Sequence, residues 1–138
     1  MQRDPMVANN YAFALTNAGN LKEAKRVVQN VDTTSISAHD NAVLNATRGL
    51  IKFRSGKSEQ GRELYNKTIT FFNGENDKRA LCRAYLFLGR EELRSGNVGG
   101  MGYVKKASKF AETFAILEIT AYCNYLLTSY GKPAESAK

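Results

Sequence analysis

Apolar residues recur with a helical period along most of this chain, and short polar or glycine-containing stretches separate the apolar runs. Leu21, Ala24, Val27, Val28 and Val31, for example, fall on one stripe of a helix with 3.6 residues per turn. This spacing is typical of an amphipathic helix and differs from the alternation of a half-buried strand. The pattern therefore predicts an all-α protein.

The apolar runs predict seven helices in one domain that spans residues 1–138. The first helix begins with the N-cap pair Asp4-Pro5 and ends before Gly19. The others are expected at about 21–31, 39–55, 58–72, 78–95, 98–112 and 114–130. They group into units at about 4–36, 39–73 and 77–112, followed by a capping helix at 113–130 and a tail at 131–138.

Four glycines, at intervals of 35 to 40 residues, each end an apolar run: Gly19, Gly56, Gly96 and Gly131. Repeats of this length are typical of stacked helix pairs that bury their apolar faces against one another. Two helices that cross closely need small residues at the crossing. We expect such contacts between Ala12 and Ala24 and between Gly49 and Gly61, and a wider crossing where Gly89 faces Met101.

These residues resemble the tetratricopeptide repeat (TPR) family. The similarity is carried by Tyr11-Ala12, Gly19-Asn20-Leu21 and Glu23-Ala24 in the first unit, and it recurs at Gly49, Gly56, Gly61, Tyr65, Tyr85, Leu88-Gly89 and Gly96-Asn97. The intervals depart from the family period of about 34 residues, so other solenoids of helix pairs remain open. The resemblance implies a right-handed superhelical solenoid of antiparallel helix pairs that binds a peptide or protein segment in a concave groove.

The resemblance places the groove on the first helix of each unit. The expected partner-binding residues are Asn9, Phe13, Asn17, Thr47, Leu50, Arg54, Arg79, Arg83, Phe87, Arg90 and Arg94. The last five form an arginine row beside an aromatic ring, which suits carboxylates or phosphates because guanidinium binds them bidentately. The alternative is that these arginines form a solvated helix face.

The chain has 138 residues and a formal net charge of +7, from 20 basic and 13 acidic residues. This charge favours an acidic partner and leaves open a nucleic-acid-associated module that uses the arginine face, although no nucleic-acid-binding motif accompanies it. No apolar run is as long as the roughly 20 residues that cross a bilayer, and the N-terminus does not have the pattern of a secretory signal. We expect a cytoplasmic protein with Cys82 and Cys123 reduced, and a segment of a longer array in which Gly131 begins an unfinished unit.

Residue patterns typical of catalysis are weak. His39 is the only histidine, and the glycine-rich stretch 96–105 lacks the Gly-Lys-Ser/Thr ending of a phosphate loop. We therefore predict a scaffold without catalytic residues, cofactor or metal. The aromatic residues of the last helix, Tyr122, Tyr125 and Tyr130, are expected in the core or in contacts between helices, with self-association through this helix as the alternative.

Overall fold

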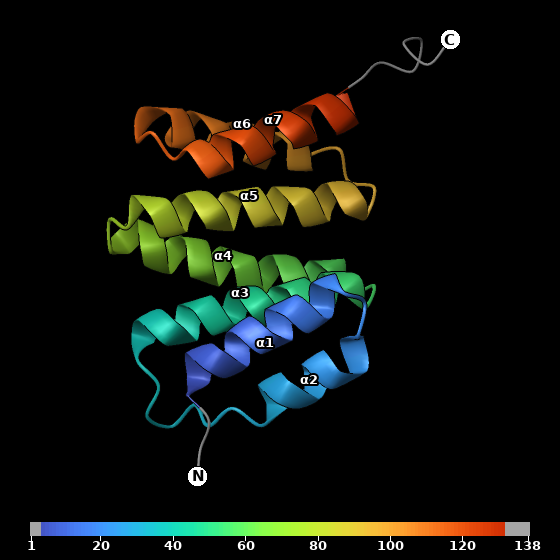
Figure 1. Ribbon diagram of the computed structural model, residues 1–138, viewed down its shortest axis with the longest axis vertical. Coiled ribbons are helices and arrows are strands. Elements are labelled where there is room, and N and C mark those ends of the chain that lie inside the picture. Colours follow the sequence, from blue (N-terminus) through green and yellow to red (C-terminus); the bar gives the residue numbers. More distant parts are fainter. Residues whose placement is uncertain (1–3, 132–138) are drawn as a thin grey trace. The chain divides into compact units, whose positions relative to one another are not determined.

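The computed structural model describes residues 4–131, and within this range it contains seven helices and no strand (Figure 1). The helices are α1 (Pro5–Asn17), α2 (Leu21–Gln29), α3 (Ala38–Arg54), α4 (Ser58–Gly74), α5 (Lys78–Arg94), α6 (Gly100–Thr113) and α7 (Leu117–Gly131). The predicted all-α class and the seven helices are confirmed. The predicted tail beyond Gly131 lies outside the described residues.

The chain divides into two compact units, Met1–Phe71 and Phe72–Lys138. The boundary falls inside α4, so that the last turn of α4 is grouped with α5, α6 and α7. The single domain over 1–138 and the three repeats at 4–36, 39–73 and 77–112 remain predictions.

In the first unit, α1, α2 and α3 pack against one another (Figure 1). Their shared core contains small and branched apolar side chains: Ala8, Ala12, Ala24, Val27, Val28, Leu44 and Ile51. The Asp4 carboxylate accepts a hydrogen bond from the Met6 N–H at 2.8 Å, and Pro5 occupies the first turn, as the sequence predicted. The predicted contact surfaces of Ala12 and Ala24 are both fully buried.

In the second unit, α6 packs against both α5 and α7. The core between these helices is made of Cys82, Leu86, Leu93, Val104, Ala107, Ala111, Ile116, Ile119, Cys123 and Leu126. The two cysteines are free and buried.

Three of the four turn glycines have the left-handed backbone conformation, with φ of +88° at Gly19, +80° at Gly56 and +90° at Gly96. At each of them the helix ends in the same way. The glycine N–H and the N–H of the next residue donate to carbonyls of the last turn, as in Asn20 N–H to Leu15 O at 2.8 Å. Gly131 differs from these three: it is the last residue of α7, and its φ lies outside the left-handed range. The unfinished unit predicted to begin there lies beyond the described residues.

Two pairs of helices are in close contact at glycines. A Cβ atom added at Gly61 would lie 2.8 Å from the Gly49 carbonyl oxygen, as the predicted contact requires. In the second unit, however, Gly89 faces Gly100 and not Met101, and an added Cβ on Gly89 would lie 2.9 Å from the Gly100 carbonyl. The predicted wide crossing was therefore wrong. The residue opposite Gly89 is one position earlier than expected, and it is a glycine, so the backbones of α5 and α6 are in contact.

Two helices begin later than the sequence predicted. Helix α6 begins at Gly100 instead of Val98, and its N-cap residue Gly99 has no side chain to accept a hydrogen bond. Helix α7 begins at Leu117 instead of Phe114, because Ala115 adopts φ +56° and the Ile116 N–H donates to the Ala111 carbonyl at 2.8 Å. This helix end could not be predicted from the sequence, because glycine or asparagine is the usual residue in the left-handed conformation and position 115 is an alanine.

Candidate protein-interaction surfaces

The arginine row lies along α5, which Asp77 caps by accepting a hydrogen bond from the Ala80 N–H at 3.1 Å. Arg79, Arg83 and Arg94 are exposed, whereas Arg90 is buried. The opposite side of α5 is buried through Leu81, Leu88 and other apolar residues. Helix α5 therefore presents an exposed cationic face, interrupted at Arg90.

Arg79 binds a carboxylate from another helix. Its Nη1 donates to Glu118 Oε1 at 2.5 Å, and both side chains are about 60% exposed (59% and 64%). The pKa of the Glu118 carboxyl is lowered, chiefly by a hydrogen bond from its own backbone N–H and next by the hydrogen bond from Arg79. The charge of Arg83 acts in the same direction. An ion pair this exposed contributes little to folding stability.

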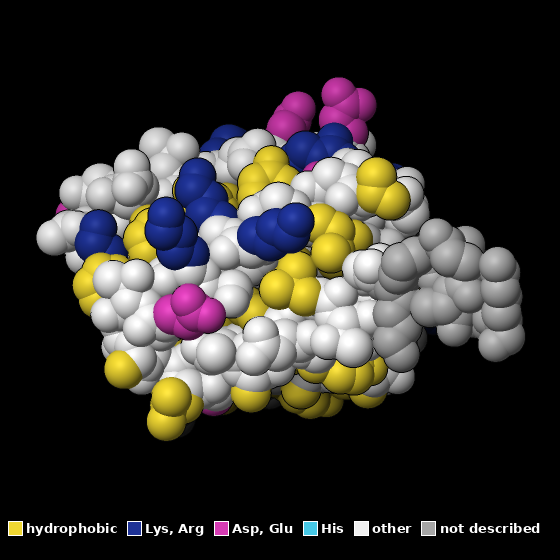
Figure 2. Space-filling model, turned by 90° about the horizontal axis from the view of Figure 1, so that it is seen from above, with side chains coloured by type: hydrophobic (Ala, Val, Ile, Leu, Met, Phe, Trp, Pro, Cys, Tyr) yellow, Lys and Arg dark blue, Asp and Glu magenta, His cyan; other side chains and the backbone are white. Residues whose placement is uncertain are grey.

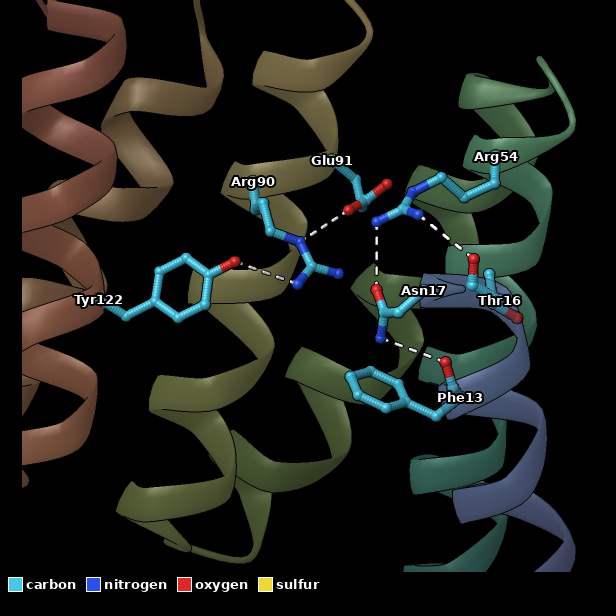
Figure 3. A network of polar contacts seen from close by, with 7 residues as sticks. All are labelled: Phe13, Thr16, Asn17, Arg54, Arg90, Glu91 and Tyr122. Carbon is cyan, nitrogen blue, oxygen red and sulfur yellow. Dashed lines mark hydrogen bonds and ion pairs between the residues drawn. The ribbon is translucent and has the colours of Figure 1, made fainter. Parts of the chain in front are cut away.

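Arg90 connects α5 with α7 (Figure 3). Its Nε donates to Glu91 Oε2 at 2.8 Å, its Nη1 donates to the Tyr122 hydroxyl at 3.3 Å, and its guanidinium lies 4.8 Å from the centre of the Phe87 ring. Burial acts to lower the pKa of Arg90, but the bonds to Tyr122 and Glu91 outweigh it and raise the pKa. Arg90 is thus engaged in the fold, and little of its side chain is left for a ligand.

On the first unit, Arg54 and Asn17 form a hydrogen-bonded pair between α3 and α1 (Figure 3). Arg54 Nη2 donates to Asn17 Oδ1 at 3.2 Å and Arg54 Nη1 to the Thr16 carbonyl at 3.4 Å, while Asn17 Nδ2 donates to the Phe13 carbonyl at 3.2 Å. The structure thus brings together three of the predicted residues, Phe13, Asn17 and Arg54.

Three other predicted residues of this unit are buried. Asn9, Thr47 and Leu50 are at most 4% exposed, so each offers almost no surface to a partner. The prediction placed them on a groove because the family resemblance assigns one face of the first helix of each unit to the groove. Helical periodicity cannot distinguish a face that lines a groove from one that packs in the core.

A basic cavity in the first unit was missed by the sequence analysis. It has a volume of about 350 Å³, and its polar lining residues are Lys25, Gln29, Arg48, Lys52, Ser55 and Lys57. The sequence pattern that could have indicated it is the spacing of polar residues on α2 and α3. Lys25 and Gln29 are four residues apart, as are Arg48 and Lys52, and residues at this spacing share a helix face.

Exposed apolar side chains gather on α7 and the turn before it. Leu117 is 76% and Tyr125 66% exposed, and Tyr130 and Phe114 are also exposed. Figure 2, which looks onto α6 and α7, shows hydrophobic side chains interspersed with Lys and Arg side chains. The prediction that Tyr125 and Tyr130 belong to the core was wrong, whereas Tyr122 is partly buried against it.

His39 lies in the first turn of α3, with its Nδ1 3.1 Å from Asp40 Oδ1. Residues 4–131 contain no group of three or more His, Cys, Asp or Glu side chains that could hold a metal ion. In the same part of the chain, no helix is both long enough and apolar enough to cross a membrane. No protein-family model, curated protein or solved structure matches this chain.

Proposed function

We propose that this chain is a non-catalytic protein-interaction module, a TPR-like array of antiparallel helix pairs, that binds an acidic peptide segment on the exposed arginine face of α5. The observation that carries the proposal is the Arg79–Glu118 ion pair. A carboxylate already occupies one end of the arginine row, in a bond that solvent weakens and that a ligand carboxylate can replace.

The remaining residues of the face support the same partner chemistry. Arg83 is exposed one turn after Arg79, and Arg94 is exposed near the end of α5. The ring of Phe87, partly buried, lies between them along the helix and supplies an apolar contact. An acidic peptide with an aromatic or aliphatic residue fits this combination, since guanidinium groups bind carboxylates bidentately.

The repeated elements support the array. Glycine in the left-handed conformation follows α1, α3 and α5, and a backbone contact between glycines recurs in the α3–α4 and α5–α6 pairs, at Gly49 with Gly61 and, one residue earlier in the second helix, at Gly89 with Gly100. Stacked helix pairs of this kind present their first helices to a ligand. The net charge of +7 adds a long-range attraction for an acidic partner.

The test is a fluorescence-anisotropy titration of the full chain with a labelled peptide of alternating Glu and Leu, and with the same peptide carrying Lys in place of Glu. We expect binding of the acidic peptide alone. Arg83→Glu should weaken it about tenfold, which corresponds to about 1.4 kcal/mol. Lys109→Glu changes the charge equally at an exposed position on α6 and should leave the affinity within about twofold after correction for net charge.

A labelled single-stranded RNA in the same assay tests the alternative of a nucleic-acid-associated module. Tighter binding of RNA than of the acidic peptide, with an affinity that falls linearly on a log–log salt plot and a slope that Arg83→Glu reduces, would favour the alternative. Equal binding of the acidic and the lysine peptide would overturn the proposed function.

A further inference from the structure

The cavity of the first unit combines positive charge with an unusual lack of counter-charge. Four of the nine residues that line it are Lys or Arg, and none is Asp or Glu. They come from three helices or their ends: Lys25 from α2, Arg48 and Lys52 from α3, and Lys57 from the residue before α4. Like charges that converge on one cavity repel one another unless an anion binds between them.

Arg48 shows the lack of counter-charge most clearly. Its side chain is partly buried, and burial lowers the pKa of its guanidinium with no opposing contribution. Within the described residues its side chain has neither an ion pair nor a hydrogen bond. Arg90 in the second unit is the contrast, because it is more deeply buried and a carboxylate and a hydroxyl bind it. A partly buried arginine without an acceptor is destabilising on its own.

A hydroxyl donor completes the polar lining. The Ser55 Oγ atom is buried and has no hydrogen-bond partner in the described part of the chain. Buried hydroxyl groups in folded proteins normally have a partner, so an unpaired one indicates a missing ligand atom or water.

Nearby acidic side chains do not neutralise the cavity. Glu23 on α2 pairs with Arg26, and Glu59 and Glu63 on α4 are exposed. None of the three lines the cavity. The remaining wall is apolar and is formed by Val28, Ile51 and Leu64.

We propose that this cavity between α2, α3 and the start of α4 binds a small phosphate-bearing molecule. The phosphate group lies among Lys25, Arg48, Lys52 and Lys57 and accepts a hydrogen bond from the Ser55 hydroxyl. The carbon part of the ligand contacts Val28, Ile51 and Leu64. A volume of about 350 Å³ falls in the range of small-molecule sites, at roughly 300–1,000 Å³. A dianionic phosphate matches four cations better than a single carboxylate does.

The experiment is a two-dimensional ¹H–¹⁵N NMR titration of the full chain with phenyl phosphate, with benzoate and benzyl alcohol as matched ligands and with sodium chloride at equal ionic strength. We expect saturable shifts at residues around the cavity with phenyl phosphate, and at least tenfold weaker binding of benzoate. Uniform shifts that sodium chloride reproduces would overturn the proposal, since they would show ionic-strength effects only.

Two variants localise the site. Arg48→Gln should raise the melting temperature in phosphate-free buffer, because it removes a partly buried cation without an acceptor, and it should abolish the stabilisation by phenyl phosphate. Lys67→Gln removes an exposed charge of α4 outside the cavity and should retain that stabilisation. A loss of binding in both variants, or in neither, would contradict the proposal.

A further probe distinguishes the source of the phosphate. A phosphoserine peptide that binds with the same variant pattern and more tightly than phenyl phosphate would overturn the small-molecule ligand in favour of a modified protein. The site is also separable from the proposed function. Arg83→Glu should leave the phenyl phosphate affinity unchanged, and Arg48→Gln should leave acidic-peptide binding unchanged, because the two residues belong to different units.

Discussion

The glycine at position 89 is required by the distance between two helices and not by its backbone angles. A Cβ atom there would lie 2.7 Å from Val104 Cγ2 and 2.9 Å from the Gly100 carbonyl oxygen. Gly102 lies only two residues beyond Gly100 in α6, but it is exposed and a Cβ on it would meet nothing within 4 Å. A substitution at Gly89 therefore tests close helix packing, whereas one at Gly102 tests only the conformational preference of glycine in a helix.

We expect Gly89→Ala to lower the free energy of unfolding by about 1–3 kcal/mol, because the added methyl group forces α5 and α6 apart. Gly102→Ala is the control and should raise it by up to about 0.5 kcal/mol, since alanine has a higher helix propensity than glycine and position 102 lies in the first turn of α6. Urea denaturation followed by circular dichroism measures both. Opposite signs for the two substitutions are the diagnostic result, and destabilisation by both would contradict the described crossing.

The buried thiols make stability depend on alkaline pH. Burial raises the pKa of both Cys82 and Cys123 from the ordinary value of 9.0 to about 11. The folded state therefore keeps protons that the unfolded state loses, and stability must fall as pH rises between about 9 and 11. Below pH 9 the thiols are protonated in both states and contribute no pH dependence.

We expect the free energy of unfolding to decrease with pH more steeply in the natural chain than in a Cys82→Ala, Cys123→Ala variant over pH 9 to 11. The comparison removes the contributions of lysines and tyrosines, which titrate in the same range and are common to both proteins. Urea denaturation at several pH values gives the two slopes. Identical slopes would show that the thiols are accessible to water in the folded state.

At the scale of the elements, Arg90 connects α5 with α7 through its bond to the Tyr122 hydroxyl, and it is paired with Glu91 on its own helix. The Glu91 side chain is completely buried and that of Arg90 is 10% exposed. A buried ion pair contributes little relative to an apolar pair, but the loss of one member is costly. Removing the Glu91 carboxylate should therefore lower the free energy of unfolding more than removing the Tyr122 hydroxyl does.

Glu91→Ala should lower the free energy of unfolding by about 3–5 kcal/mol, because it removes the carboxylate that Arg90 Nε binds in a buried place. Tyr122→Phe removes only one hydrogen bond and should cost about 0.5–1.5 kcal/mol. Thermal and urea unfolding of the two variants test this order. A larger effect of Tyr122→Phe would show that the hydroxyl, and not the carboxylate, is the principal partner of Arg90.

At the scale of the whole molecule, the exposed apolar side chains of α7 bear on the assembly of the chain. Leu117 and Tyr125 are among its most exposed large apolar residues. We propose that the chain self-associates through this helix, since several large apolar side chains exposed on one helix favour an interface.

Sedimentation velocity should show a concentration-dependent dimer that the double variant Leu117→Ser, Tyr125→Ser reduces at least tenfold in association constant. Val98→Ser is the matched control, because Val98 is 81% exposed but lies in the turn before α6. If all variants associate with the same constant as the natural chain, the interface lies outside α7. A natural chain that stays monomeric at all concentrations would contradict self-association.

Much of the candidate surface could be predicted from the sequence, but its accessibility could not. Helical spacing placed Arg79, Arg83 and Arg94 on one face of α5, and all three are exposed. The same spacing included Arg90, which is buried because Tyr122 of α7 lies close to it. The basic cavity escaped prediction for a related reason, since its cations come from different elements that only packing brings together.

The existence of the seven helices, the Asp4-Pro5 cap of α1 and three glycine turns could be predicted from the sequence, because these depend on interactions within a few residues of one another. Packing between helices sets the contact of Gly89 with Gly100, the burial of Asn9, Thr47 and Leu50, and the convergence of four cations on one cavity. These features depend on the rotation and register of one helix against another. A shift of one residue turns a helix by about 100°, and the apolar pattern is too coarse to specify it.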